Sequence, residues 1–175
     1  MEIAGDVSLK GSNWRKAIEG FAPFLPLPLQ PNYSLYTLSI AIGIMYDKQL
    51  DIAGDENDIE KESRPAVPRT ILYSHNTELD FLFQTAILTS KLIDYDEKTR
   101  MKIAFGQDSD IKFNKFEFLS KFANFGVGKL LEQLSDDNIE TMENIKKFIS
   151  SSVEGYNYEL DEISEDDLKI EDLEE

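Results

Sequence analysis

Cysteine is absent from the 175-residue chain, and histidine occurs once, at position 75. The absence of cysteine excludes disulfides, thiolate nucleophiles and cysteine-ligated zinc or iron–sulfur centres. The presence of only one histidine excludes a multi-histidine metal site. The chain also lacks a run of 18 apolar residues and does not begin with a basic stretch followed by an apolar one. We therefore expect a cytoplasmic protein that neither spans a membrane nor carries an export signal. We expect no bound metal and no cofactor.

Basic residues are scarce relative to acidic ones, and the imbalance is concentrated at one end of a chain whose formal net charge is −16. Residues 1–134 carry 15 basic and 19 acidic residues, a net charge of −4, whereas residues 135–175 carry 3 and 15, a net charge of −12. A strongly acidic chain repels nucleic-acid phosphates at long range, but a nearly balanced body with local basic clusters need not. We predict a helical domain over 1–152 and a disordered acidic tail over 153–175.

The N-terminal part of the sequence predicts one short strand and two helices. Polar and apolar residues alternate over 6–10, between two glycines, and this is the period of a strand. A helix follows from a cap at Ser12 or Asn13, and the proline-rich stretch 23–28 ends it. Over 33–46, apolar residues cover nearly the whole circumference of a second helix. That helix must be buried on several faces, either by this chain or by a second copy of it.

The remaining sequence predicts further helices joined by polar segments. We expect an acidic loop over 50–64, followed by a segment over 65–74 that Pro65 and Pro68 keep extended. Within it, residues 70–73 favour a strand. Two helices are predicted from capping residues: one over 79–90, capped by Thr77 with Asp80, and a short one ending near Phe105, capped by Asp94 with Glu97. Two more helices, over 115–134 and 138–150, are predicted from periodicity alone. The predicted fold class is therefore mainly α.

Two patterns imitate ligand-binding loops, and each fails on its context. Gly126, Gly128 and Lys129 resemble part of a phosphate-binding loop, but no strand precedes them and Leu130 replaces the hydroxyl that would hold magnesium. Small residues where two helices approach closely explain the glycines better. Residues 51–62 have the acidity of a calcium loop without its alternation of ligands, so a solvated loop is favoured.

The single histidine and its neighbours are the remaining candidates for catalysis. His75 would need a nucleophile and an orienting acid, and Ser74 is its only suggestive neighbour in sequence. Glu78 and Asp80 lie two positions apart, so on a helix they point in different directions and do not form a carboxylate pair. We favour a structural histidine over a hydrolase and predict that the protein is not an enzyme.

A family resemblance gives a more specific hypothesis. One strand followed by two helices, the second strongly apolar, is the layout of a ribbon-helix-helix unit, whose strand pairs with its twin from a second chain and enters the DNA major groove. The turn Pro31–Asn32 leads into "YSLYTLSIAIGI"; Arg69 opens "PRTILYSHNTELDFLFQTAI"; and "FLSKFANFGVGKLLEQL" contains Asn124, Gly126 and Leu130. In this order, over roughly residues 7–134, these motifs resemble the DndE family of bacterial DNA sulfur modification.

The resemblance implies a fold and a set of partners. DndE proteins are small, mostly helical oligomers that work with sulfur-transfer and ATPase partners to place phosphorothioates in the DNA backbone, and lysines link them to DNA. They are not thought to be the catalytic subunit. This chain departs from the family in two ways: its second helix has no basic residue before Lys48, and its C-terminal part is extra and acidic. Both departures argue against direct binding to DNA more than they argue against the fold.

Two hypotheses of different classes follow. The first is a non-catalytic, oligomeric subunit of a bacterial DNA phosphorothioate-modification and phage-defence system, with double-stranded DNA and the other modification proteins as partners. Its DNA-binding candidates are Lys10, Arg15 and Lys16, which are otherwise ordinary solvated charges. The second is an adaptor or inhibitor whose acidic tail docks on a basic, DNA-binding partner. The tail also admits two other interpretations, solubility and mimicry of DNA.

Overall fold

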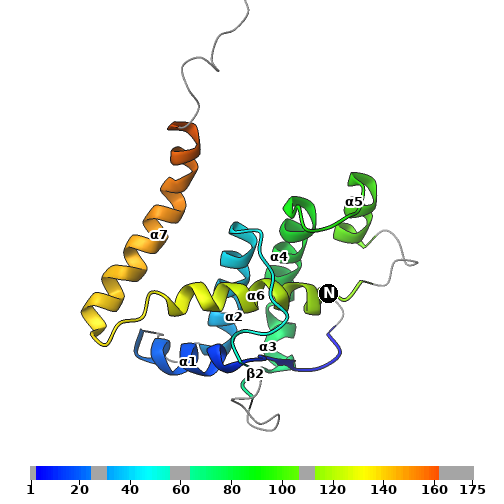
Figure 1. The fold of residues 1–175 in the computed structure, drawn as a ribbon. Coiled ribbons are helices and arrows are strands. Elements are labelled where there is room, and N and C mark those ends of the chain that lie inside the picture. Colours follow the sequence, from blue (N-terminus) through cyan, green and yellow to red (C-terminus); the bar gives the residue numbers. More distant parts are fainter. Residues whose placement is uncertain (1–2, 25–30, 56–63, 107–112, 162–175) are drawn as a thin grey trace, which may run out of the picture. The chain divides into compact units, whose positions relative to one another are not determined.

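The computed structural model describes residues 3–24, 31–55, 64–106 and 113–161, the last nine of these and Pro31 by their backbone alone. Contacts divide the chain into an N-terminal unit, Met1–Glu132, and a C-terminal unit, Gln133–Glu175. The elements, labelled in Figure 1, are β1 (Val7–Ser8), α1 (Ser12–Phe21), the 3₁₀ turn η1 (Ala22–Phe24), α2 (Pro31–Met45), β2 (Ala66–Val67), α3 (Arg69–Ser74), α4 (Asn76–Thr89), α5 (Glu97–Phe105), α6 (Lys115–Leu131) and α7 (Asn138–Asp161). The predicted fold class, mainly α with a short N-terminal strand, is confirmed.

The core of the N-terminal unit is the crossing of α2 and α6, which lie against each other in Figure 1. Two glycines make the crossing close. A Cβ on Gly43 would lie 2.2 Å from the Phe122 carbonyl oxygen, and a Cβ on Gly126 would lie 1.9 Å from the Ser39 carbonyl oxygen. The predicted role of small residues at a close helix contact is therefore confirmed at Gly126. A Cβ on Gly128 would lie 3.9 Å from the Asn13 side-chain nitrogen, which is an ordinary contact.

The apolar helix α2 is covered mainly by its own chain. Besides α6, the elements α1, α4 and β2 contact it. Tyr36 and Ile40 are fully buried, whereas Leu38 is 45 % and Met45 is 47 % exposed. The predicted helix over 33–46 is thus confirmed, and intramolecular packing accounts for most of its burial. A strip of apolar surface that includes Leu38 remains open to solvent.

The two strands form a small antiparallel sheet inside one chain. Val7 pairs with Val67, and Ser8 pairs with Ala66. A strand predicted over 6–10 is confirmed at its centre. The resemblance implied that this strand pairs with a second copy of the chain, but β2 of the same chain lies beside it instead.

The extended segment predicted over 65–74 is confirmed at β2, Ala66–Val67, and is wrong from Arg69 to Ser74, where α3 lies. Pro68 occupies the N-cap position of α3 with an extended backbone, and its side chain supplies no cap. The cap comes from elsewhere in the chain: a carboxylate oxygen of Asp6 accepts the Arg69 N–H at 2.7 Å. This long-range hydrogen bond satisfies a free amide at the start of the helix and outweighs the strand propensity of the residues that follow.

Three predicted helix caps are also wrong. At α1 the N-cap is Gly11, and the Ser12 hydroxyl accepts the Asp55 N–H at 3.1 Å rather than capping its own helix. His75 takes the N-cap position of α4 without a side-chain hydrogen bond, so Thr77 and Asp80 form no capping box. At α5 the cap is Asp96 and not Asp94, since Asp96 accepts the Thr99 N–H at 2.7 Å. At α1 the Ser12 hydroxyl is therefore used by a distant segment, at α4 no side chain caps the helix, and at α5 the cap lies two residues after the predicted one.

The C-terminal unit is described through α7, which confirms the helix predicted over 138–150 and continues to Asp161. Thr141 is buried, and its hydroxyl accepts the Ser135 N–H at 3.0 Å. Ile139, Met142 and Ile149 are 71 %, 56 % and 52 % exposed. The predicted tail overlaps α7 over 153–161, and its remainder, 162–175, lies outside the described residues, as does 56–63 of the predicted acidic loop. Among the described residues, no helix is long and apolar enough to cross a membrane.

Candidate functional site

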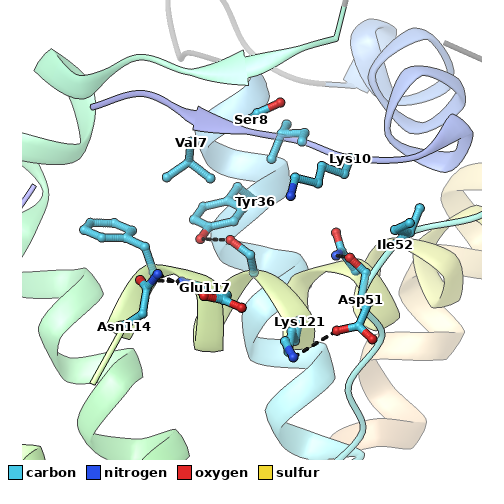
Figure 2. A pocket seen from close by; sticks show the side chains of 13 residues that line it. Val7, Ser8, Lys10, Tyr36, Asp51, Ile52, Asn114, Glu117 and Lys121 are labelled. Atoms are coloured by element: carbon cyan, nitrogen blue, oxygen red, sulfur yellow. Dashed lines mark hydrogen bonds and ion pairs between the residues drawn. The ribbon is translucent and has the colours of Figure 1, made fainter. Parts of the chain in front are cut away.

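A polar cavity of about 500 Å³ lies between β1 and α6 in the N-terminal unit. Figure 2 shows Val7, Ser8 and Lys10 on one side of it and side chains of α6 on the other. The lining residues come from β1 and the residues after it, from α2, from the loop before β2 and from α6: Val7, Ser8, Leu9, Lys10, Tyr36, Asp51, Ile52, Asn114, Phe116, Glu117, Ser120, Lys121 and Asn124. We call this cavity the β1–α6 slot.

Tyr36 of α2 forms the inner wall of the slot. Its side chain is fully buried, and its hydroxyl shares a hydrogen bond of 3.1 Å with the Ser120 hydroxyl. Burial disfavours the phenolate and raises the pKa of Tyr36 to about 12, against the opposing effect of the Ser120 hydrogen bond. At neutral pH the Tyr36 hydroxyl is therefore a neutral group, and it presents no charge to the slot.

Residues 50–53 close one end of the slot by bridging its two sides. The Leu50 N–H donates to the Lys121 carbonyl at 2.9 Å, and the Ala53 N–H donates to the Lys10 carbonyl at 3.0 Å. The Lys121 ammonium lies 2.9 Å from the Asp51 carboxylate. The hydrogen bond between them raises the pKa of Lys121. The shape of the slot is therefore fixed by backbone hydrogen bonds between segments that are far apart in sequence.

Asn124 of α6 holds the segment that closes this end of the slot. Its amide oxygen accepts the Trp14 indole N–H at 2.9 Å, and its amide nitrogen donates to the carbonyls of Leu50 at 3.1 Å and Asp51 at 2.9 Å. Asn124 and Trp14 are both buried. The resemblance singled out Asn124, and its contacts give it a structural role that connects α1, the loop and α6.

The three predicted DNA-binding residues are all exposed but do not share one environment. Lys10 lines the slot. Arg15 and Lys16 lie on α1, where the Arg15 guanidinium pairs with Glu19 at 3.2 Å. Of the three, Lys10 alone belongs to the slot, and the other two belong to a solvent-facing side of α1.

His75 is held by neighbours that the sequence did not predict. Its ring stacks on Tyr33, with ring centroids 4.4 Å apart, and its Nδ1 lies 3.3 Å from the Glu78 carboxylate. The Tyr33 hydroxyl donates to the same carboxylate at 2.8 Å. That hydrogen bond lowers the pKa of Glu78, while burial and then Glu78 raise the pKa of Tyr33. Ser74 donates its hydroxyl to the Ile71 carbonyl at 2.9 Å, so it does not form a pair with His75.

The carboxylates Glu78 and Asp80 have different partners, as predicted. Glu78 contacts Tyr33 and His75, whereas Asp80 lies 3.5 Å from the Lys115 ammonium. This arrangement cross-links helices α2, α4 and α6 at their ends. Within the described residues, no group of three or more metal-ligating side chains is placed to hold an ion.

Sequence reasoning missed the slot, although a signal for it was present. Asn114, Glu117, Lys121 and Asn124 recur at intervals of three, four and three along an otherwise apolar helix. Such spacing places polar side chains in one stripe on α6. The stripe predicts a polar surface, but it does not say that β1 lies opposite it.

We compared the chain with protein-family models, with curated proteins and with solved structures. None of the three comparisons found a match. The proposed relationship to the DndE family therefore rests on the sequence motifs alone.

Proposed function

We propose that the chain is a non-catalytic subunit of an oligomeric assembly that acts in bacterial DNA phosphorothioate modification. The observation that supports assembly is an apolar groove of about 640 Å³ between α2 and α4. Leu38, Phe81 and Leu82 form its apolar part, and Thr37, Thr77 and Glu78 complete its lining. The link to DNA modification is supported by the motifs that resemble DndE proteins.

The groove lies where α2 is not covered by its own chain. Leu38 is 45 % exposed and Phe81 is 68 % exposed. Burying a large apolar side chain completely stabilises an association by about 1.5–3 kcal/mol, and contiguous exposed apolar surface commonly marks a protein contact. A second copy that packs its own α2–α4 groove against this one would remove both side chains from water.

We expect Phe81→Lys to convert an oligomer into a monomer. In a symmetric contact the substitution removes two aromatic side chains and places two ammonium groups in the interface, so the dissociation constant should rise by about hundredfold or more. Native mass spectrometry of the full chain at micromolar concentration measures this. Met101→Lys on α5, another exposed apolar position, is the matched control and should not change the mass.

A monomeric wild-type chain in that measurement would contradict the proposed assembly. The same measurement on a chain that lacks residues 154–175 tests the adaptor hypothesis, which the exposed apolar side of α7 favours. If Phe81→Lys leaves a complex intact and the truncation abolishes it, the acidic C-terminal part makes the contact and the α2–α4 groove does not.

The proposed contact with DNA depends on Lys10, Arg15 and Lys16. Replacing all three with alanine should weaken binding to duplex DNA uniformly across sequences and reduce the slope of log K against log salt by about 3, since each cation neutralises one phosphate. Fluorescence anisotropy with intact and nicked duplexes, at low and moderate salt, measures both quantities.

The control for this experiment removes the same charge elsewhere. Lys91, Lys98 and Lys147 are exposed on other parts of the chain, and their replacement by alanine should leave the salt slope nearly unchanged. Equal losses for the two triple variants would show that only net charge matters. An absence of binding even at low salt would exclude a direct contact with DNA.

A further inference from the structure

The edge of β1 that faces away from β2 belongs to residues that line the β1–α6 slot. In an antiparallel pair, residues alternate between those whose backbone groups bond to the partner strand and those whose groups point away from it. The Leu9 N–H donates to the Pro65 carbonyl at 2.9 Å, so Leu9 is of the first kind. By alternation Val7 is of the first kind too, and the N–H and C=O of Ser8 point away from β2. Ser8 is also one of the residues that line the slot.

Two hydrogen bonds support this orientation. The Asn32 side-chain amide donates to the Ala66 carbonyl at 2.9 Å, which shows that the backbone of Ala66, the residue opposite Ser8, faces away from β1. The Lys10 carbonyl, two residues along the same edge from Ser8, accepts the Ala53 N–H at 3.0 Å. Thus the chain itself already adds a backbone segment to this edge at Lys10, and no described backbone group is hydrogen-bonded to Ser8 on the same edge.

The charged side chains around Ser8 differ in whether they have partners. Asp51 pairs with Lys121 at 2.9 Å, and Glu117 accepts a hydrogen bond from the Asn114 amide at 3.0 Å. Among the described residues, no carboxylate lies within ion-pair distance of Lys10, and the Lys10 side chain lines the same slot (Figure 2). Within the part of the chain that the structure describes, the slot therefore offers a free backbone edge beside a cation that has no acidic partner.

We propose that the β1–α6 slot takes an extended peptide segment of a partner protein, which adds as a strand to β1 at Ser8 and places an acidic side chain beside Lys10. Strand addition gives affinity through backbone hydrogen bonds, and the side-chain contacts on either side give specificity. The polar stripe of α6 lies opposite the added strand, and Tyr36 with Ser120 lies behind it. This site goes beyond the proposed function, since it requires neither DNA nor a second copy of the chain.

The test is an NMR titration of the full chain with a capped pentapeptide, Thr-Val-Glu-Val-Thr, which favours an extended backbone. We expect the Ser8 amide resonance to shift and its hydrogen exchange to slow as the peptide binds. Ser8→Pro removes the N–H on the outer edge of β1 without removing a donor to β2, and it should weaken binding by about tenfold, as expected for the loss of a backbone hydrogen bond. Lys10→Glu should also weaken binding, whereas Lys16→Glu on α1 should not.

Folding of the Ser8→Pro variant is checked by the fluorescence of Trp14, which is buried in the same unit. Should that variant unfold, Lys10→Glu and a peptide methylated on its central amide nitrogen give the same test. The proposal is overturned if the pentapeptide leaves the Ser8 amide unchanged up to its solubility limit, or if neither Lys10→Glu nor the methylated peptide weakens binding. A synthetic peptide of residues 162–175 that bound more tightly than the pentapeptide would also overturn it, because the occupant would then be the chain's own end.

Discussion

Gly126→Ala is expected to destabilise the N-terminal unit by about 3 kcal/mol, because overpacking against backbone has few routes of relief. The added Cβ would lie 1.9 Å from the carbonyl oxygen and 2.7 Å from the carbonyl carbon of Ser39 on α2. No rotamer change removes a clash between two backbones, so α2 and α6 must separate and lose contact along their crossing. Urea unfolding followed by Trp14 fluorescence measures the loss, since the chain has one tryptophan and it lies in this unit.

The matched control is Gly128→Ala, two residues along the same helix. There a Cβ would meet only the Asn13 side chain at 3.9 Å, an ordinary contact. Because alanine favours a helix interior over glycine, this variant should be more stable than the wild type by roughly 0.5–1 kcal/mol. Opposite signs for the two substitutions would confirm the close crossing, and similar small effects for both would contradict it.

Asn124→Leu is expected to cost about 3 kcal/mol, since it leaves a buried donor and two carbonyl acceptors without their partner. The Trp14 indole N–H loses its acceptor at 2.9 Å, and the carbonyls of Leu50 and Asp51 lose their donor. The side chains have similar volume, so packing changes little and the loss reports the hydrogen bonds. Urea unfolding followed by circular dichroism provides the measurement.

A double-mutant cycle with Trp14→Phe separates the indole bond from the other two. Phenylalanine has no N–H to leave unsatisfied, so the cost of Asn124→Leu should be smaller in that background by about 1–2 kcal/mol. If the two substitutions are additive, the hydrogen bond between Trp14 and Asn124 contributes nothing to stability.

Periodicity predicted the helices well because their apolar faces follow from local spacing. The helix over 33–46 was recognised from its apolar residues, and the glycine at 126 was correctly interpreted as a close contact. The failure at 70–73 had a non-local cause, because the amide of Arg69 is capped by Asp6, which is 63 positions away. A sequence pattern confined to a short window carries no information about such a partner.

The slot and the histidine cluster were missed for the same physical reason. The polar stripe on α6 was visible in the sequence, but its position opposite β1 depends on how residues 50–53 bridge the two. Likewise, Tyr33 stacks on His75 across 42 positions of sequence, and nothing near His75 indicated it. By contrast, the exposure of Lys10, Arg15 and Lys16 follows from their places between apolar neighbours, and the structure agrees with it.

Because α2 packs mainly against α6, its apolar surface stays uncovered for a time while the chain is being synthesised. The ribosome completes α2 at Met45, but α6 ends only at Leu131, which is 86 residues later. At a translation rate of 5–20 residues per second, the most apolar helix of the protein waits roughly 4–17 s for its main partner. Until then the nascent chain presents that surface to other polypeptides, so we expect chaperones that bind apolar segments to engage it at this stage of translation.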